Sequence, residues 1–367
     1  MRSLFAIATF LLLTGHISTG FTIDGASNQS YAIAEDGSVK AWGWDIVNAL
    51  NVPPELTNCV ALSGSAGNVF CLGLRDDGRV FGWGNNYTNQ IAIPPTLSNV
   101  VAIAAGSEHS LALTQQGVVV GWGGNRQGKA TPPPSLSNVI AIAAAPEHSL
   151  ALGADGRVTA WGDTLKGAVN VPAGLSNVVA IAAGHYGSLA LRDNGVITYW
   201  GDVPSPPVTT GIIAIAGNYQ HYLALLMNGT VRAWGLNVNG QCNVPPGLSN
   251  VVAIAAGGFH SMALTAEGQL VCWGGNSGGQ TNVPDFTWKI PFQQEHAIAE
   301  VSVGEDSPII GMQITSERSV RYTMMASSDL ARWETVLPFW TGSDSLTTLH
   351  LLPPDNKQTM FYRVFRE

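Results

Sequence analysis

Short apolar runs separated by glycine-containing turns recur along most of this chain. Residues 100–123, VVAIAAGSEHSLALTQQGVVVGWG, hold three such runs: VVAIAA, HSLALT and VVVGWG. Runs of this length that are rich in Val, Leu and Ile and bounded by turn residues predict β-strands. Small and large apolar residues alternate along them, which is expected of a sheet covered on both faces. We therefore expect a unit of three buried strands.

The unit repeats along the chain, and a Trp-Gly pair marks each copy. The seven tryptophans are separated by 41, 39, 39, 39, 34 and 39 residues. They are Trp42, Trp83, Trp122, Trp161, Trp200, Trp234 and Trp273. A period near 40 residues is typical of a propeller or another repeat array. We expect the tryptophans to form core between the blades, because every copy has one at the same strand position.

A glycine stands five residues before every one of these tryptophans, between two apolar runs. The seven are Gly37, Gly78, Gly117, Gly156, Gly195, Gly229 and Gly268. A tight hairpin needs a positive φ, which glycine adopts without strain. Each glycine therefore predicts a turn between the second and third strands of its unit.

The fold class that follows is all-β, a seven-bladed β-propeller of about 39-residue repeats over residues 21–284. An open solenoid would need polar capping repeats at its ends, and the first and seventh units are as apolar as the others. We therefore expect a closed ring in which Phe21 lies beside the blade containing Trp273. The Asn-Val-Pro-Pro segments between units predict extended links, with a weak fourth strand as the alternative.

At this level of detail the repeat, VVAIAAG-x-x-HSLAL-x-x-x-G-x-V-x-x-WG-x-N, resembles that of the regulator-of-chromosome-condensation family. Its length is most similar to the compact secreted bacterial members of the β-lactamase-inhibitor protein II type. The resemblance covers residues 21 to about 284 and implies a propeller. It says less about function, because propellers have many unrelated functions.

The two ends of the chain differ from the repeats. Residues 1–20, with Arg2 before the apolar run 4–13 and small residues before Phe21, predict a signal peptide. Residues 285–367 alternate apolar and polar positions, and their pattern Y-x-x-x-x-S-x-DL-x-x-W … FYRV resembles a small C-terminal β-module common in large secreted bacterial proteins. A long irregular tail that wraps the ring is the alternative. The protein is therefore expected to be secreted, whether extracellular, periplasmic or on the cell surface. No later segment approaches 18 apolar residues, so we expect no membrane insertion.

Charge and cysteine content narrow the functional classes. A formal net charge of −8 and the lack of a basic stripe argue against a nucleic-acid partner. The four cysteines, Cys59, Cys71, Cys242 and Cys272, could form two disulfides in an oxidising compartment, but no CxxC pair indicates a zinc or redox site. Cys71 and Cys272 fall inside expected strands, which favours four free thiols.

Histidines recur thirteen residues before four of the tryptophans, as His109, His148, His221 and His260. Four imidazoles in a ring could suggest a metal, but equivalent positions lie on separate blades. We expect each to bond loop backbone within its own blade. No motif for a catalytic nucleophile, a phosphate loop or a metalloprotease is present, so we expect no catalysis, no cofactor and no metal.

Function is expected in the loops that follow the AAG segments, because strands hold the ring together and loops vary. In the inhibitor-type relatives, the residue before the histidine position is usually aromatic and forms the protein-binding face. The candidate partner-binding residues here are Glu108, Glu147, Tyr186, Tyr219 and Phe259. Asn125, Arg126 and Asn237, after the Trp-Gly pairs, are expected on the opposite rim.

The function predicted from the sequence is a secreted, monomeric propeller that binds a partner protein through rim loops. An inhibitor of an extracellular enzyme and a carbohydrate- or cell-surface-binding protein are the alternatives. An inhibitor would titrate an enzyme at one-to-one stoichiometry, whereas a scaffold would enrich a partner without changing an activity.

Overall fold

The computed structural model describes residues 22–65 and 67–290 in full. Beyond them it describes the backbone of seven strands between residues 295 and 366. The predicted signal peptide and Phe21 lie outside the described residues. The described residues up to 290 belong to one compact unit, and the strands from residue 295 onward belong to another.

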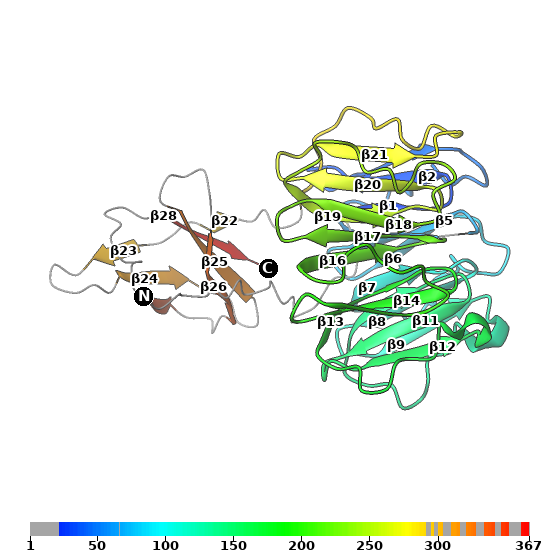
Figure 1. Cartoon of the computed structure of the whole chain (residues 1–367), viewed down its shortest axis with the longest axis horizontal. Helices are drawn as coiled ribbons and strands as arrows, with labels where there is room; N and C mark the ends of the chain where they lie inside the picture. Colours follow the sequence, from blue (N-terminus) through cyan, green and yellow to red (C-terminus); the bar gives the residue numbers. More distant parts are fainter. Residues whose placement is uncertain are drawn as a thin grey trace. The chain divides into compact units, whose positions relative to one another are not determined.

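The first unit consists of seven sheets, each of three antiparallel strands in sequence order (Figure 1). The first strands are β1 Ile23–Gly25, β4 Cys59–Gly64, β7 Val100–Ala105, β10 Val139–Ala144, β13 Val178–Ala183, β16 Ile212–Gly217 and β19 Val251–Ala256. The second strands are β2 Gln29–Ile33, β5 Phe70–Arg75, β8 His109–Thr114, β11 His148–Gly153, β14 Gly187–Arg192, β17 His221–Leu226 and β20 His260–Thr265. The third strands are β3 Val39–Gly43, β6 Val80–Gly84, β9 Val119–Gly123, β12 Val158–Gly162, β15 Ile197–Gly201, β18 Val231–Gly235 and β21 Leu270–Gly274. This confirms the predicted all-β, seven-bladed propeller.

The predicted turns are also present. All seven glycines before the tryptophans have φ between 72° and 81°, in the left-handed region that favours glycine. The Asn-Val-Pro-Pro links form turns, so each sheet of the ring has three strands. Two short 3-10 helices, η1 Arg126–Gly128 and η2 Leu165–Gly167, lie in the links that follow β9 and β12. In the described part of the chain, no helix is long and apolar enough to cross a membrane.

The first strands of the blades contact one another in a complete circuit, from β1 through β4, β7, β10, β13, β16 and β19 back to β1. They therefore line the centre of the ring. Strand β1 of the first blade contacts β19 and β20 of the seventh, which brings the first blade (blue in Figure 1) next to the last one (yellow). Ile23 of the first blade packs with Met262 and Leu264 of the seventh. The ring is closed.

A segment that follows the seventh blade completes the first one. Trp288 pairs with Ala34, and the backbone N–H of Glu35 donates to the carbonyl of Thr287 at 3.0 Å. In the third blade the same place is taken by Val100, which pairs with Thr114. Strand β1 starts only at Ile23, so the C-terminal segment supplies the missing start of the first strand of its sheet.

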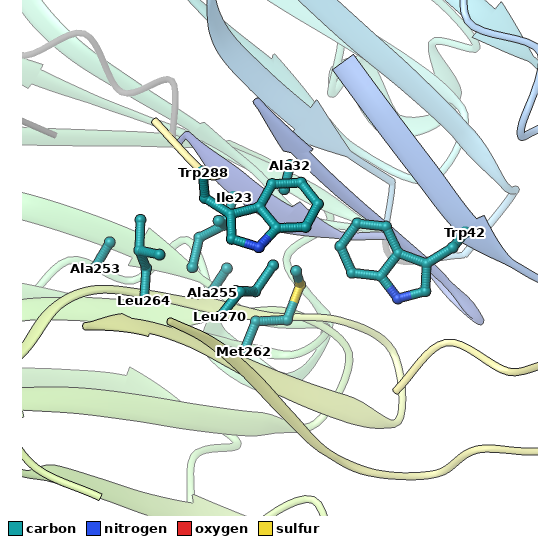
Figure 2. Close-up of a cluster of buried hydrophobic side chains, with 9 residues drawn as sticks. All are labelled: Ile23, Ala32, Trp42, Ala253, Ala255, Met262, Leu264, Leu270 and Trp288. Carbon is teal, nitrogen blue, oxygen red and sulfur yellow. The ribbon is translucent and has the colours of Figure 1, made fainter. Parts of the chain in front are cut away.

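The closing contact is also a core contact. Trp288 is buried, and its indole lies beside Ile23 and Ala32 in Figure 2, with Trp42 further along the same cluster. The ring centroids of Trp42 and Trp288 are 5.7 Å apart. Closure therefore combines strand pairing with burial of two indoles between the first and last blades.

The recurring tryptophans attach every blade except the sixth to the link before it, and serines do the same in five of the blades. In the third blade, Trp122 Nε1 donates to the carbonyl of Gln90 at 2.8 Å, and Ser110 Oγ donates to the same oxygen at 2.7 Å. The first blade repeats this arrangement across the closure, where Trp42 and Ser30 bond the carbonyl of Gln280. All seven tryptophans are buried, as predicted.

The second unit has two small antiparallel sheets among its described strands. They are β22 Glu295–His296, β23 Glu300–Val303, β24 Ile310–Thr315, β25 Arg321–Ser327, β26 Glu334–Thr341, β27 Leu346–Leu351 and β28 Phe361–Arg366. One sheet has the order β22-β28-β25-β26 and the other β23-β24-β27. The domain boundary at residue 284 stays a prediction, and the pairing of Trp288 shows that the ring uses residues beyond it.

Candidate protein-binding rim

The ring has two rims, which the strand directions define. The loop rim comprises the loops between first and second strands together with the residues that follow the third strands. The turn rim comprises the glycine turns between second and third strands. Gly123, at the end of β9, lies opposite His109, at the start of β8, and Gly124 N–H donates to the carbonyl of Glu108 at 2.6 Å.

This geometry corrects one prediction. Asn125 and Arg126 follow Gly124, and Asn237 holds the matching place after β18, so they lie on the same rim as Glu108 and not on the opposite one. The reason is that adjacent antiparallel strands bring the end of the third strand next to the start of the second. The opposite rim is formed by turns such as that at Gly117.

The structure places all five predicted partner-binding residues in the loops between the first and second strands of the third to seventh blades. Three of them belong to one aromatic run. The ring centroids of Tyr219 and Phe259 are 5.6 Å apart, and His185 lies 4.9 Å from Tyr219 and stacks on Tyr186 at 3.8 Å. His185 was not predicted; its position beside Tyr186 in the same loop was the available signal. All four rings are half-buried, so each presents part of its surface to solvent.

The two glutamates form a second group with a buried lysine. Lys129 Nζ lies 3.4 Å from Glu108 Oε2 and 3.7 Å from Glu147 Oε2, and it donates to the carbonyl of Pro146 at 2.8 Å. The lysine side chain is 1% exposed, whereas those of the glutamates are 38% and 33% exposed. Lys129 replaces the glutamine found at the matching link position in other repeats, as at Gln90. Its ammonium group fixes the two loops relative to each other.

Exposed apolar side chains also gather on the loop rim, and sequence reasoning missed them. They are Trp44 at 52%, Tyr87 at 86%, Leu165 at 67% and Val238 at 74% exposure, and each follows a third strand. The turn rim has fewer, among them Val118 and Met227. Large exposed apolar groups on one face mark a candidate interaction surface.

We call the packed interface between two neighbouring blades a junction. The junction between the fifth and sixth blades differs from the others, and it lies next to the aromatic run. Its link is the short one, with 34 residues between Trp200 and Trp234. Trp234 Nε1 is buried and has no hydrogen-bond partner, unlike the indole of Trp122. Tyr222 replaces the junction serine, and its hydroxyl fills the space beside Gly187, where other blades have histidine. The interface between these two blades therefore has different core packing from the other interfaces, and its rim loops carry His185, Tyr186 and Tyr219.

The four repeated histidines bond serines of the next blade, so the expected bond to loop backbone in the same blade was wrong. His109 Nε2 lies 2.8 Å from Ser149 Oγ, and His260 Nε2 lies 2.7 Å from Ser30 Oγ across the closure. His148 and His221 bond Ser188 and Ser261 in the same way. The histidine enters its strand just where the next blade packs against it, which period and spacing alone do not reveal.

These pairs are not nucleophile–base dyads. Ser149 Oγ donates its hydrogen to the carbonyl of Lys129 at 2.8 Å, so it accepts a bond from His109, which assigns the proton to Nε2. The two side chains are buried. A histidine that donates to a buried serine cannot take a proton from it, and the arrangement is structural.

Burial lowers the pKa of these histidines strongly. It brings the pKa of His109 and His260 to about 3 and that of His148 and His221 to about 4. In all four, Nδ1 is buried without a hydrogen-bond partner. Protonation would place a charge and an unsatisfied N–H donor inside the junction, so these imidazoles stay neutral near pH 7.

Comparison with known proteins agrees with this architecture. Residues 63–90, 100–129, 212–241 and 251–280 match the family model of the Regulator of chromosome condensation (RCC1) repeat. Each segment ends on the link residue, Gln90, Lys129, Gln241 or Gln280, whose carbonyl holds the next blade. These four segments of the ring therefore resemble RCC1 repeats in sequence.

Solved structures with the same fold come from plants and yeast. The ectodomain of the Arabidopsis thaliana receptor kinase ACR4 is 20% identical over 74% of this chain and 98% of its own, with a TM-score of 0.59. Prp20p of Saccharomyces cerevisiae is 18% identical over 74% of this chain and 86% of its own, with a TM-score of 0.58. The ectodomain of the Physcomitrella patens receptor kinase CR4 is 23% identical over 69% and 72%, with a TM-score of 0.57. Comparison with curated protein sequences gave no match.

The described part of the ring offers little metal-ligating or reactive thiol chemistry. Within residues 22–65 and 67–290, no three His, Cys, Asp or Glu side chains are grouped so as to hold a metal ion. The four cysteines are free, as the sequence favoured. Burial raises the pKa of the Cys59 thiol to about 11, which keeps it protonated and unreactive.

Proposed function

We propose that this protein is a secreted, non-catalytic propeller that binds a partner protein through its loop rim. The observation that carries the proposal is the aromatic run of Tyr186, His185, Tyr219 and Phe259, which extends without a gap over three blades. Half-buried aromatic side chains supply large contact areas and are common anchors at protein interfaces. The exposed Trp44 and Tyr87 extend the apolar surface of the same rim.

The positions of the titratable and aromatic side chains favour a binding function over a catalytic one. The histidines with the most strongly lowered pKa values lie inside the junctions, where each donates to a serine. The rim offers instead flat aromatic surface and two glutamates held by Lys129. Such a surface suits recognition of another folded protein, with aromatic anchors at its centre and charged groups beside them.

The structural relatives are consistent with a protein partner. Yeast Prp20 has been solved in complex with Kap60, and its binding to Gsp1p and histones has been described. We propose that this chain shares the use of a propeller as a binding surface and not those partners, because residues 1–20 predict export from the cell. The likeness to the compact secreted bacterial members remains a prediction that rests on repeat length.

Affinity capture from the extracellular medium of the native host tests the proposal. The double variant Tyr186→Ala/Phe259→Ala should lose capture by about 100-fold or more in affinity, because anchor side chains often contribute about 2 kcal/mol or more each. It should melt at the temperature of the unaltered protein, since these loops add little to the core. Glu108→Gln and Glu147→Gln should mainly slow association and reduce its salt dependence.

The matched control lies on the turn rim. Val118→Ala/Met227→Ala removes two exposed apolar side chains from that rim, 53% and 48% exposed. This variant should capture the partner normally. Loss of capture in the control, with normal capture by the aromatic variant, would move the binding surface to the turn rim.

A further inference from the structure

The first strands of the ring enclose a small cavity with an unusual polar group in it. The cavity has a volume of about 90 Å³, and its walls are mainly Ala and Ile from the first strands. Three polar side chains line it: Asp24, Ser63 and Asn218. A carboxyl group and an amide among alanines require a physical reason, because burying polar groups without partners is costly.

Asp24 stands where other blades have alanine, as at Ala104 and Ala143. Its Oδ1 accepts the backbone N–H of Gly25 at 2.8 Å, and its Oδ2 accepts that of Gly64 in the next blade at 2.9 Å. Both oxygens therefore have one donor each and lone pairs to spare. The carboxyl is enclosed by the ring, yet part of the residue remains accessible from the cavity.

Asn218 stands where other repeats have glycine, as at Gly106 and Gly257. It is 6% exposed, and its Nδ2 donates to the carbonyls of Gly25 at 2.9 Å and Ala256 at 2.7 Å. Those two bonds use both amide hydrogens and fix the orientation of the group. Its Oδ1 is buried and accepts no hydrogen bond.

The cavity thus offers unused acceptors and no unused side-chain donor apart from the hydroxyl of Ser63, which itself accepts the N–H of Ala105. A ligand that fits must bring several N–H donors and a positive charge, in a volume that suits one small head group. We propose that this cavity binds an ammonium group between the Asp24 carboxylate and the Asn218 amide oxygen.

The ammonium group has two sources. One is a small free amine; the other is a lysine side chain of the protein partner, and this second source rests on the function proposed above. Asn218 is followed directly by Tyr219 of the aromatic run, so the cavity and the binding rim share a loop. A partner bound on the aromatic run would therefore contact the loop that supplies one wall residue of the cavity.

The charge of the site depends on Asp24 alone near neutral pH. Burial raises the pKa of Asp24 to about 7, although the N–H donors of Gly64 and Gly25 oppose the shift. The titratable neighbours stay neutral: burial raises the pKa of Tyr31 and Cys71 well above their ordinary values and lowers that of His260 to about 3. A bound ammonium group would favour the carboxylate form of Asp24.

Titration of the purified, isotope-labelled protein with ethylammonium chloride at constant ionic strength tests the site. The amide signals of Gly25 and Gly64 and the side-chain NH2 of Asn218 should shift and saturate in the millimolar range. Asp24→Asn should weaken binding by about tenfold or more, and Ser63→Ala, which alters the same wall, by no more than about twofold. Tetramethylammonium, which has the charge without N–H donors, should not bind. Equal binding of tetramethylammonium, or equal affinity in Asp24→Asn, would overturn the proposal.

A second measurement removes any dependence on the folding of Asp24→Asn. In the unaltered protein, ethylammonium should bind about fivefold or more weaker near pH 5.5 than near pH 8, because Asp24 is protonated at the lower pH. An affinity that does not change with pH would also overturn the proposal.

Competition separates the two sources. If the partner inserts a lysine, ethylammonium should release the captured partner; if the ligand is a free amine, ethylammonium should bind while capture persists. The Tyr186→Ala/Phe259→Ala variant should lose the partner and keep the ethylammonium shifts. Failure of the rim proposal and failure of the cavity proposal therefore give different results.

Discussion

In the four His–Ser pairs between neighbouring blades, the serine hydroxyl donates its single hydrogen to a link carbonyl, so the histidine of the preceding blade is the donor to the serine. Ser149 shows both bonds, to the carbonyl of Lys129 and to His109. The histidine is therefore committed to the neutral form with the proton on Nε2. A residue type that usually titrates near neutral pH is here a pH-independent donor until the solution becomes acidic enough to force a proton onto Nδ1.

The ring should accordingly lose stability in acid. Unfolded histidines have a pKa near 6.5, and burial lowers that of His148 and His221 to about 4 and of His109 and His260 to about 3 in the folded chain. Between these values the unfolded state binds more protons, so the free energy of unfolding falls as pH drops from about 6.5 to about 4. Urea unfolding near pH 7.5 and pH 4.5 should show this loss, and His148→Gln should reduce it by about 2 kcal/mol.

Protonation of Asp24 has the opposite effect on the free energy of unfolding, so a variant of Asp24 serves as the control. Its pKa is raised from 3.8 to about 7, so the folded state binds the extra proton as pH falls from about 7 to about 4. In Asp24→Asn this compensation is absent, and the loss of stability in acid should be steeper than in the unaltered chain. A stability that is flat with pH in His148→Gln and in the unaltered chain alike would contradict the junction chemistry.

At the level of elements, strands and turns followed from local sequence because their determinants are local. Apolar runs and glycines with a required positive φ predict a hairpin without knowledge of its surroundings. The composite first strand did not follow, because Trp288 lies outside any repeat and pairs with Ala34 at the other end of the ring. A single tryptophan after the last repeat carries no pattern that identifies its partner.

Trp288→Ala should open the closure. The indole is 4% exposed and fills the place that a valine takes in other blades, so its removal should cost about 3 kcal/mol or more in the free energy of unfolding. Hydrogen exchange at Glu35, whose N–H donates to Thr287, should accelerate more than exchange in the middle blades.

Phe286→Ala is the matched control, because Phe286 is 47% exposed in the same segment. That change should cost less than about 1 kcal/mol. If the two substitutions lowered the free energy of unfolding equally, Trp288 would add only buried apolar surface, and its pairing with the first blade would not hold the ring closed.

At the scale of the molecule, seven similar units predict a ring, since each sheet needs a neighbour on both faces. The candidate site was harder. The residues in the loops before the histidine position could be named from the repeat, and Tyr219 and Phe259 do meet. The rim assignment of Asn125 and Arg126 was wrong because it followed order along the chain instead of the antiparallel return of the third strand. The contacts of Lys129 with Glu147, and of His185 with Tyr219, join different blades, which one repeat does not specify.

In a closed ring, the interface between the last and first blades should be as stable as the interface between any two neighbouring blades. Two substitutions compare these interfaces. His260→Ala breaks the bond to Ser30 at the closure, and His109→Ala breaks the matching bond to Ser149 between the third and fourth blades. The two substitutions should lower the free energy of unfolding by amounts that agree within about 0.5 kcal/mol. If His260→Ala lowered the free energy of unfolding by less than half as much as His109→Ala, the first and seventh blades would be packed less tightly than the third and fourth.

The pairing of Trp288 with the first blade has a consequence for biosynthesis. Ser30 and Gln280 meet at the closure although 250 residues separate them, and Trp288 follows Gln280 in order of synthesis. The sheet made first is thus the last to be finished, and until then the backbone beside Ala34 is an unpaired strand edge of the kind that recruits other chains. A truncated or stalled product keeps that edge open, and only a chain translated past Trp288 can hide it. An incomplete chain therefore exposes an unpaired strand edge, which chaperones and proteases can bind, whereas a complete chain does not.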